Sequence, residues 1–220
     1  MEQLVFLHIP KCAGRSMIDL LGRNYFNILI MNNMQVLSQI PKWELETYDL
    51  IAGHMNYQYI KALGFKTMTV VRDPLERTIS QYNHFMTMET SALEADVMIK
   101  DNYTFIDFVT SSDPNISFWT NMYTSQFGGD GGGVLDIRTF IKRAETSIEE
   151  IDFVGIFEQM DETVSRVKDR YHLEGDFNKI GKTPKKNRIA ELTKKEKKIA
   201  REYLTPDYTL YNKALEMFNA

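Results

Sequence analysis

Five short apolar runs, separated by segments with helical spacing, constrain the fold of this chain more than any other feature of its sequence. The runs are Leu4–Leu7, Ile28–Met31, Leu50–Ala52, Thr67–Val71 and Phe153–Phe157. The helical segments are Ser16–Leu21, Leu75–Phe85, Phe105–Val109 and Thr163–Tyr171. Short continuous apolar runs are typical of strands buried on both faces of a parallel sheet. The alternation therefore predicts an α/β fold of three layers, with helices on both faces of a central, mainly parallel sheet.

Length and composition limit how many such sheets the chain can hold. With 220 residues, of which 43% are hydrophobic, the chain can close one substantial core, so we expect a single domain over residues 1–220. The formal net charge of −4 argues against a general nucleic-acid-binding protein, whose surface is usually basic. Local basic pockets for phosphate or sulfate are compatible with that charge.

The compartment is indicated by the single cysteine, Cys12, which rules out an internal disulfide and fits a reducing environment. The N-terminus lacks the basic and long apolar regions of a signal peptide, and no run of about 18 apolar residues predicts a transmembrane helix. We therefore expect a cytoplasmic, bacterial protein without a transmembrane segment. The alternative is a trimmed domain of a lumenal or secreted protein.

The segment after the first apolar run reads His8-Ile9-Pro10-Lys11-Cys12-Ala13-Gly14-Arg15-Ser16 and precedes a helical segment. A short loop in this place directs backbone N–H groups and the positive end of the helix toward an anion. Lys11 adds a positive charge, and the hydroxyl of Ser16 can donate a hydrogen bond. The segment predicts a phosphate-binding loop, and the alternative is an ordinary turn between a strand and a helix.

The spacing in this loop disfavours two other classes of phosphate-handling enzyme. A nucleotide P-loop has Gly, four residues and then Gly-Lys-Ser/Thr, whereas here Lys11 precedes Gly14, so a P-loop kinase is disfavoured. Cys12 at a helix N-terminus would suit the thiolate of a cysteine phosphatase. Those enzymes place an arginine six positions after the cysteine, and here that residue is Ile18.

A second cluster spans the end of the fourth apolar run and the helical segment after it. It reads Val70-Val71-Arg72-Asp73-Pro74-Leu75-Glu76-Arg77-Thr78-Ile79-Ser80-Gln81-Tyr82. Arg72 stands at the carboxyl end of a strand, the edge at which α/β sheets bind ligands. Asp73 is a good N-cap and Pro74 a good first helical residue. Arg72 and Ser80 can together hold one phosphate, and the alternative is a capped helix with an Arg–Asp pair on the surface.

The segments HIPKCAGRSM and VVRDPLERTISQY, in this order, resemble the paired phosphate-binding segments of sulfotransferases that use 3′-phosphoadenylyl sulfate (PAPS), especially the carbohydrate branch. The resemblance covers nearly the whole chain and continues in Asn121–Tyr123, Gln126–Gly128, Phe153–Glu158, Asn187–Arg188 and Asp207–Tyr211. It implies a P-loop-like fold and transfer of a sulfuryl group from PAPS to an acceptor hydroxyl. The product would be 3′-phosphoadenosine 5′-phosphate (PAP), and no metal would be needed.

The resemblance also implies roles for individual residues. The loop around the 5′-phosphosulfate would consist of Pro10, Lys11, Cys12, Ala13, Gly14, Arg15, Ser16 and Met17. Arg72 and Ser80 would bind the 3′-phosphate. The counterpart of the late loop that closes over the nucleotide is Gly181–Arg188, with Lys182, Lys185 and Lys186. Arg15 departs from the family pattern, in which a small hydroxyl residue is usual, and it would add charge to the sulfate site or shift the loop.

The chemistry requires a base for the acceptor and stabilisation of the leaving group. A sulfuryl group carries less negative charge than a phosphoryl dianion, so oriented amides and Lys11 can suffice without a metal. The best candidate for the base is His54, at the expected end of another strand, because its ordinary pKa suits proton abstraction near neutral pH. A similarly placed histidine occurs in the glycan 2-O-sulfotransferases that the chain resembles. The alternatives are a packing role for His54, His84 as the base, or a glutamate before Asp49, and we expect His8 to shape the loop.

Several other patterns have a structural and a functional interpretation. Phe118, Trp119 and Tyr123 have the spacing of core residues, and stacking on a sugar or on adenine is the alternative. Glycines 128, 129, 131, 132 and 133 predict a mobile surface loop, and the alternative is a lid. A solvated helix face is predicted for Lys194, Lys195, Lys197 and Lys198.

Two helices are predicted at the C-terminal end. Thr193 and Glu196 have the spacing of a capping box, which starts a helix. Thr205 and Pro206 have the pattern of an N-cap and first residue of a last helix. Its inner face would carry Leu210, Ala214 and Phe218.

The acceptor has no readable signature, because acceptor loops vary most. We expect a carbohydrate or another hydroxyl-bearing molecule. The sulfotransferase has two alternatives. One is a non-catalytic nucleotide- or glycan-binding module, which would not need His54, and the other is a P-loop kinase.

Overall fold

Five parallel strands form the centre of the computed structural model, which describes residues 2–31, 39–87, 98, 101–129, 137–180 and 191–220. The strands run in the order β2-β3-β1-β4-β5, and each pairs in parallel with its neighbours. They are β1 (Leu4–Leu7), β2 (Ile28–Met31), β3 (Leu50–Gly53), β4 (Lys66–Val71) and β5 (Phe153–Ile156). All five strands predicted from the apolar runs are present, with ends within one residue of those expected, which confirms the predicted class.

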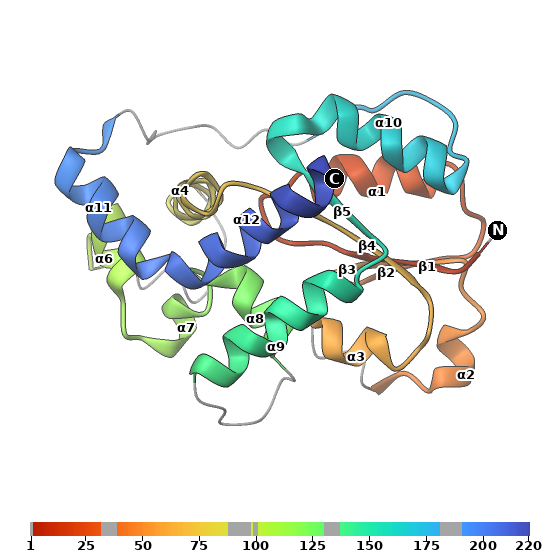
Figure 1. Cartoon of the computed structure of the whole chain (residues 1–220), viewed down its shortest axis with the longest axis horizontal. Helices are drawn as coiled ribbons and strands as arrows, with labels where there is room; N and C mark the ends of the chain where they lie inside the picture. The colour runs from red at the N-terminus through yellow and green to blue at the C-terminus, as the bar shows by residue number, and fades with distance from the viewer. Residues whose placement is uncertain (1, 32–38, 88–97, 99–100, 130–136, 181–190) are drawn as a thin grey trace.

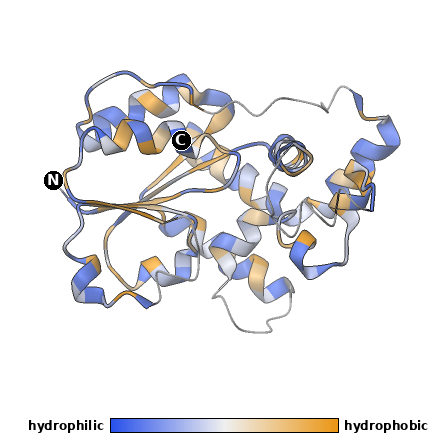
Figure 2. Cartoon of the chain, turned by 180° about the vertical axis from the view of Figure 1, so that it is seen from behind, coloured by the Kyte–Doolittle hydropathy of each residue, from blue (hydrophilic) through white to orange (hydrophobic). Residues whose placement is uncertain are grey.

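The pleat of the central strand β1 sends alternate side chains to the two faces of the sheet. Leu4 and Phe6 belong to the apolar cluster on one face, and Val5 and Leu7 to the cluster on the other. Figure 2 shows the consequence, because the strands are orange over much of their length whereas the helices carry both orange and blue residues. At the edge strand β2 the cover is incomplete, since Ile30 is 52% exposed.

Helices cover both faces of this sheet (Figure 1). α1 (Gly14–Gly22) and α10 (Met160–Tyr171) contribute residues such as Leu20 and Val167 to the cluster that contains Leu4. The opposite face is covered by α2 (Lys42–Leu45), α3 (Tyr57–Lys61), α8 (Met122–Gly128), α9 (Ile137–Glu150) and α12 (Thr205–Asn219). The predicted arrangement of three layers is therefore confirmed.

A further group of helices lies beyond the carboxyl ends of the strands, on the left of Figure 1. It consists of α4 (Pro74–Phe85), α6 (Phe105–Thr110), α7 (Pro114–Ser117) and α11 (Lys194–Tyr203). Leu75, Phe108 and Ala200 are buried in an apolar cluster that joins them. This cluster anchors α4, whose first residue, Pro74, lies two positions after the candidate phosphate-binding Arg72.

The C-terminal helices match the sequence predictions with one correction. The capping box of Thr193 and Glu196 is present at the start of α11. Thr205 is not the N-cap of α12: the cap is Leu204, and Thr205 is already helical. The reason is that α12 follows α11 almost without a break, so the Thr205 hydroxyl donates to the carbonyls of Arg201 and Glu202 instead.

The predicted solvated face of α11 is also observed, because Lys194, Lys195 and Lys198 are exposed and Lys197 is half-buried. The glycine-rich stretch lies only partly within the described residues. Gly128 and Gly129 are buried, and a Cβ atom on Gly128 would lie 2.3 Å from the carbonyl oxygen of Phe140. These two glycines therefore serve close packing of α8 on α9, while glycines 131, 132 and 133 lie outside the described residues. In the described part of the chain, no helix is long and apolar enough to cross a membrane.

Candidate functional site

The loop between β1 and α1 contains two residues with left-handed backbone. Lys11 has a φ of 72° and Ala13 a φ of 62°, a conformation that residues other than glycine adopt rarely. They turn the chain so that α1 begins at Gly14 with Ala13 as its N-cap. The alanine side chain has no oxygen, so the cap itself does not satisfy the first N–H groups of α1. Such a helix start suits the binding of an anion.

The His8 side chain packs directly against the start of α1. A Cβ atom on Gly14 would lie 1.7 Å from Cδ2 of His8, so a larger residue at position 14 would displace the ring. The His8 ring stacks on that of His54, with centroids 4.4 Å apart and an angle of 28° between the planes. Burial, together with the nearby His54 and Lys11, lowers the pKa of His8 to about 3. His8 is therefore a neutral spacer between the loop and His54.

His54 follows directly on β3, whose end lies beside that of β1. A Cβ atom on Gly53 would lie 1.9 Å from the carbonyl oxygen of Met31, so only glycine fits before the histidine. Nδ1 of His54 lies 2.8 Å from the carbonyl oxygen of His8. Because a carbonyl oxygen only accepts hydrogen bonds, Nδ1 carries the proton and Nε2 carries the lone pair. Burial lowers the pKa of His54, against the opposing effect of the hydrogen bond to His8.

Arg72 lies directly after β4 and is only 8% exposed. Its Nη1 donates to the carbonyl oxygen of Lys11 at 3.3 Å, which connects the two predicted phosphate-binding segments. Its Nη2 pairs with Glu76 at 3.2 Å, and the guanidinium lies 4.4 Å from the ring centroid of Phe157. Nε is buried and has no hydrogen-bond partner among the described residues. The alternative of an Arg–Asp pair on the surface is therefore wrong, because Arg72 is buried and its ion-pair partner is Glu76.

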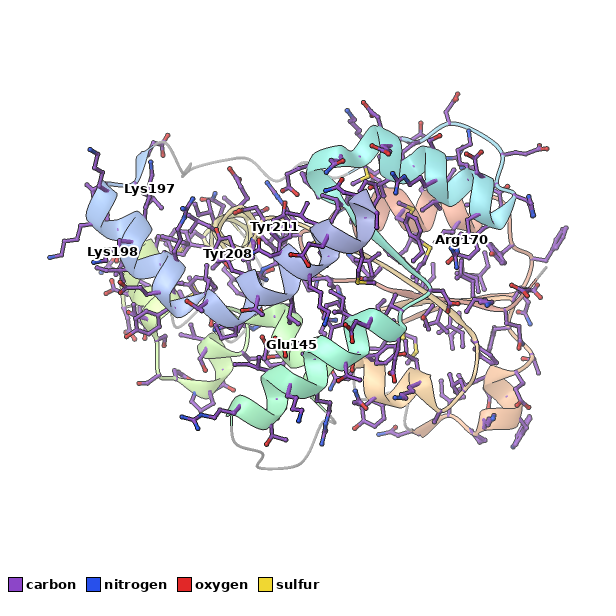
Figure 3. The ribbon with its side chains drawn as sticks, viewed as in Figure 1. Glu145, Arg170, Lys197, Lys198, Tyr208 and Tyr211 are labelled. Atoms are coloured by element: carbon purple, nitrogen blue, oxygen red, sulfur yellow. The ribbon has the colours of Figure 1, made fainter. Side chains whose placement is uncertain are left out.

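The start of α4 is capped as predicted and is also attached to α12. Asp73 accepts a hydrogen bond from the N–H of Glu76 at 2.9 Å, and Pro74 is the first helical residue. The hydroxyl of Tyr208 donates to Asp73 at 3.2 Å, and that of Tyr211 donates to Glu158 at 2.9 Å. Figure 3 shows both tyrosines on α12. These contacts fix the direction in which α4 leaves the sheet.

Positive charge accumulates around the loop. Burial, followed by the charges of Arg72, Arg15 and Arg77, lowers the pKa of Lys11 to about 8. Burial, followed by the charges of Lys11 and Arg15, lowers the pKa of His84. Ser80 lies one turn before His84 on α4 and therefore on the same face of that helix. Arg15 itself is exposed in the first turn of α1 and adds charge without preventing the loop from forming.

A buried group of polar side chains behind the loop was not predicted from the sequence. Tyr123 is fully buried, and its hydroxyl accepts from the backbone N–H of Arg72 at 2.9 Å and donates to the Arg72 carbonyl at 2.5 Å. The spacing of Tyr123 predicted a place in the core, with stacking on a sugar or on adenine as the alternative, and its core place is confirmed. Cys12 lies 3.7 Å from the same hydroxyl, and burial raises the pKa of its thiol to about 11. Cys12 is therefore a protonated packing residue, in agreement with the exclusion of a cysteine phosphatase.

The described part of the late segment runs along α1 toward the loop. Asn24 accepts from the N–H of Glu174 at 2.8 Å, and Asn178 donates to Asp19 at 3.1 Å. The N–H of Ile180 then donates to Oγ of Ser16 at 2.8 Å, which leaves the hydroxyl hydrogen of Ser16 to be donated elsewhere. Ile180 therefore lies beside the phosphate-binding loop, whereas the predicted late loop Gly181–Arg188, with Lys182, Lys185 and Lys186, lies outside the described residues.

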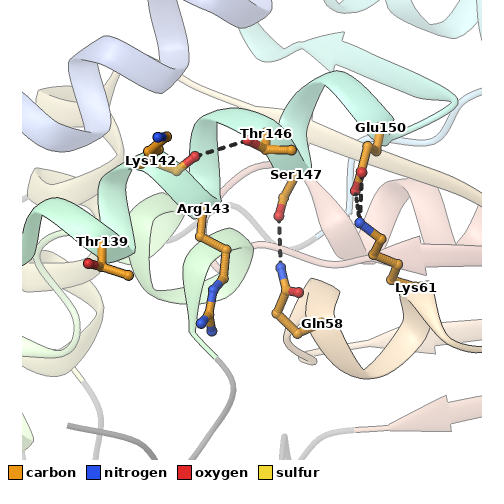
Figure 4. A pocket seen from close by; sticks show the side chains of 8 residues that line it. All are labelled: Gln58, Lys61, Thr139, Lys142, Arg143, Thr146, Ser147 and Glu150. Carbon is orange, nitrogen blue, oxygen red and sulfur yellow. Dashed lines mark hydrogen bonds and ion pairs between the residues drawn. The ribbon is translucent and has the colours of Figure 1, made fainter. Parts of the chain in front are cut away.

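A separate groove of about 290 Å³ lies between α3 and α9 (Figure 4). Among its lining residues, Lys61 pairs with Glu150 at 2.7 Å and Gln58 donates to Ser147 at 2.8 Å. None of the lining residues belongs to the two phosphate-binding segments.

Comparisons with known proteins relate the whole chain to one group of enzymes. Residues 1–219 match a family described as "Sulfotransferase family". A solved structure titled as a sulfotransferase from Alicyclobacillus acidocaldarius has 13% identity and a TM-score of 0.51, covering 100% of this chain and 99% of that one. The mouse sulfotransferase SULT7A1, solved in complex with PAP, has 12% identity and a TM-score of 0.46, covering 92% of this chain. This chain spans 64% of the length of the mouse protein. No curated protein matches the sequence.

Proposed function

Since this chain belongs to the sulfotransferase family, we propose that it transfers a sulfuryl group from PAPS to a hydroxyl group of a carbohydrate. The observation that carries the proposal is the 3.3 Å contact between Nη1 of Arg72 and the carbonyl oxygen of Lys11. It joins two anion-binding elements, the start of α1 and the end of β4. Two such elements side by side suit a nucleotide that carries phosphate at both the 5′ and the 3′ position.

The described residues fit the donor nucleotide in two respects. Nε of Arg72 is a buried donor without a hydrogen-bond partner in the described part of the chain, and a 3′-phosphate would satisfy it. The first N–H groups of α1 and the hydroxyl hydrogen of Ser16 can bind the 5′-phosphosulfate. Ser80, in the second turn of α4, would add a donor to the 3′-phosphate. Lys182, Lys185 and Lys186 stay predictions for the loop that closes over the nucleotide.

Lys11 has the charge that the leaving group requires. Its lowered pKa, about 8, reflects burial among other cations, and the negative charge of the nucleotide would offset both effects. Lys11 would then be fully protonated and would stabilise the negative charge that develops on the bridging oxygen as the bond from that oxygen to sulfur breaks. This stabilisation is the part of catalysis for which a phosphoryl transferase uses a metal ion.

His54 is the proposed base. Its Nδ1 proton is bound to the His8 carbonyl, so Nε2 is the nitrogen that takes the proton from the acceptor hydroxyl. The acceptor oxygen forms its bond to sulfur as the bond between sulfur and the donor oxygen breaks, and PAP leaves. Because its pKa is lowered, His54 is neutral and able to accept a proton at neutral pH. The acceptor's carbohydrate nature rests on the resemblance of the two motifs, and the cytoplasmic location stays a prediction.

The test is transfer of radiolabelled sulfuryl groups from PAPS to a panel of acceptors that includes oligosaccharides, nucleotide sugars and simple alcohols. We expect transfer to a sugar hydroxyl, and a loss of at least about a hundredfold in rate in His54→Asn with PAP affinity retained. A non-catalytic module would bind PAP and transfer to nothing. A P-loop kinase would consume ATP in a magnesium-dependent reaction and would not distinguish PAP from AMP.

A further inference from the structure

The hydroxyl of Tyr123 lies between the two phosphate-binding segments and contacts both. It makes two hydrogen bonds to the backbone of Arg72, one through the N–H and one through the carbonyl, and it lies 3.7 Å from Sγ of Cys12. We propose that Tyr123 is a positioning residue that sets the place of Arg72 relative to the loop and thereby the recognition of the 3′-phosphate. This inference rests on the proposed PAPS-dependent function.

The backbone of Arg72 needs such a partner because of where it lies. β4 ends at Val71, so the sheet no longer supplies hydrogen bonds to the next residue. Buried N–H and carbonyl groups are costly when they have no partner. One phenol hydroxyl satisfies both groups of Arg72, at the point where the side chain leaves the backbone. The place of the guanidinium therefore depends on the place of a single oxygen atom.

The backbone of Tyr123, which carries this hydroxyl, is in turn held by a residue of another helix. Asp207, on α12, accepts from the N–H of Tyr123 at 3.0 Å and from the N–H and hydroxyl of Thr124, both at 2.9 Å. Asn121, the N-cap of α8, makes no capping hydrogen bond through its side chain, so Asp207 caps this helix from outside. Asp207 is 0% exposed, and burial raises its pKa to about 6 against the opposing effect of these donors. Its role is to hold the backbone of Tyr123.

Arg77 attaches the same region to α4. It is fully buried, and its Nη2 donates to the carbonyls of Trp119 and Thr120, just before α8. The charge of Arg77 also acts on Tyr123 and Asp207. The start of α8 is thus fixed by one contact from α12 and one from α4, and Tyr123 extends from that fixed point to Arg72. None of these side chains reaches the surface, so they act through Arg72 and do not contact the nucleotide.

The test compares Tyr123→Phe with Tyr171→Phe, a second buried tyrosine that lies in the apolar cluster on the other face of the sheet. The quantity measured by calorimetry is the ratio of the Kd for AMP to the Kd for PAP, which reports the contribution of the 3′-phosphate. We expect Tyr123→Phe to lower this ratio at least about tenfold and Tyr171→Phe to leave it unchanged. A general loss of packing would weaken both nucleotides alike and leave the ratio intact.

Hydrogen exchange on the free protein gives a second readout. In Tyr123→Phe the amide of Arg72 loses its acceptor, so the peptide that contains it should exchange faster, whereas Tyr171→Phe should not change it. Asp207→Asn serves as the alternative variant if Tyr123→Phe does not fold, with the same expected direction in both readouts. Wild-type discrimination of PAP that persists in the variant would overturn the inference and leave the proposed function standing. Equal binding of PAP and AMP by the wild type would overturn both.

Discussion

The carbonyl oxygen of His8 lies 2.8 Å from Nδ1 of His54, and this contact fixes the tautomer of the candidate base. It depends on a close approach at two glycines. Gly14 leaves space for the His8 ring, and Gly53 allows β3 to turn beside Met31. The candidate base and the candidate phosphate-binding loop are therefore built as one unit, although the sequence separates them by more than one strand.

The first prediction concerns pH. Because burial lowers the pKa of His54, the imidazole stays neutral in more acidic solution than a free imidazole does. Activity is present where His54 is unprotonated and is lost as pH falls through its pKa. We therefore expect the acid limb of the kcat/KM profile to have its midpoint below the ordinary value of about 6.5. A limb at or above that value would contradict the assignment of His54 as the base.

The second prediction tests the packing of His8. Gly14→Ala would place a Cβ atom 1.7 Å from the His8 ring, and the displaced ring would no longer support His54. We expect turnover to fall at least about tenfold. Gly22→Ala, in the same helix, is the matched control, because its Cβ atom would meet only Cδ1 of Ile28 at 3.7 Å. Equal activity of the two variants would show that the position of the His8 ring is unimportant.

The third prediction concerns the effect of the Lys11 charge on the stability of the nucleotide-free protein. The lowered pKa of Lys11 means that the fold disfavours its protonated form, so below about pH 8 the folded protein carries this charge against burial and three arginines. We expect Lys11→Met to raise the free energy of unfolding by about 1 kcal/mol, which corresponds to a rise of a few degrees in Tm. The rate of sulfuryl transfer should fall at least about a hundredfold. Differential scanning calorimetry at neutral pH measures the first effect.

The control for this variant is Lys61→Met. Lys61 pairs with Glu150 at 2.7 Å on the surface, so its removal should lower the Tm slightly or leave it unchanged. If both lysine variants lowered the Tm alike, the charge of Lys11 would not destabilise the nucleotide-free protein.

The parts of the fold that could be predicted are those determined by neighbours in sequence. Apolar runs gave the five strands, and Asp73 with Pro74 gave the start of α4, because strand burial and helix capping are local properties. The wrong prediction of Thr205 as an N-cap also has a local origin, because its hydroxyl donates to carbonyl groups at the end of the preceding helix α11.

The rest of the site depends on contacts between distant segments. The hydrogen bonds between Tyr123 and Arg72 join residues 51 positions apart, and no spacing rule predicts such a pair. The same holds for Asp207, which caps a helix from more than 80 positions away. The motifs thus predicted where anions bind, while the side chains that hold those motifs in place became visible only in three dimensions.

The most direct test of the account is the calorimetric titration of the protein with PAP and with AMP, repeated on Arg72→Ala. Arg166→Ala is the matched control, because Arg166 also pairs with a glutamate four residues away and lies over an aromatic ring, that of Phe218 at 4.2 Å. We predict that the wild type and Arg166→Ala bind PAP at least about tenfold more tightly than AMP and that Arg72→Ala loses this preference. Equal binding of the two nucleotides by the wild type, or a preference for PAP that survives in Arg72→Ala, would contradict the proposed binding of the 3′-phosphate by Arg72.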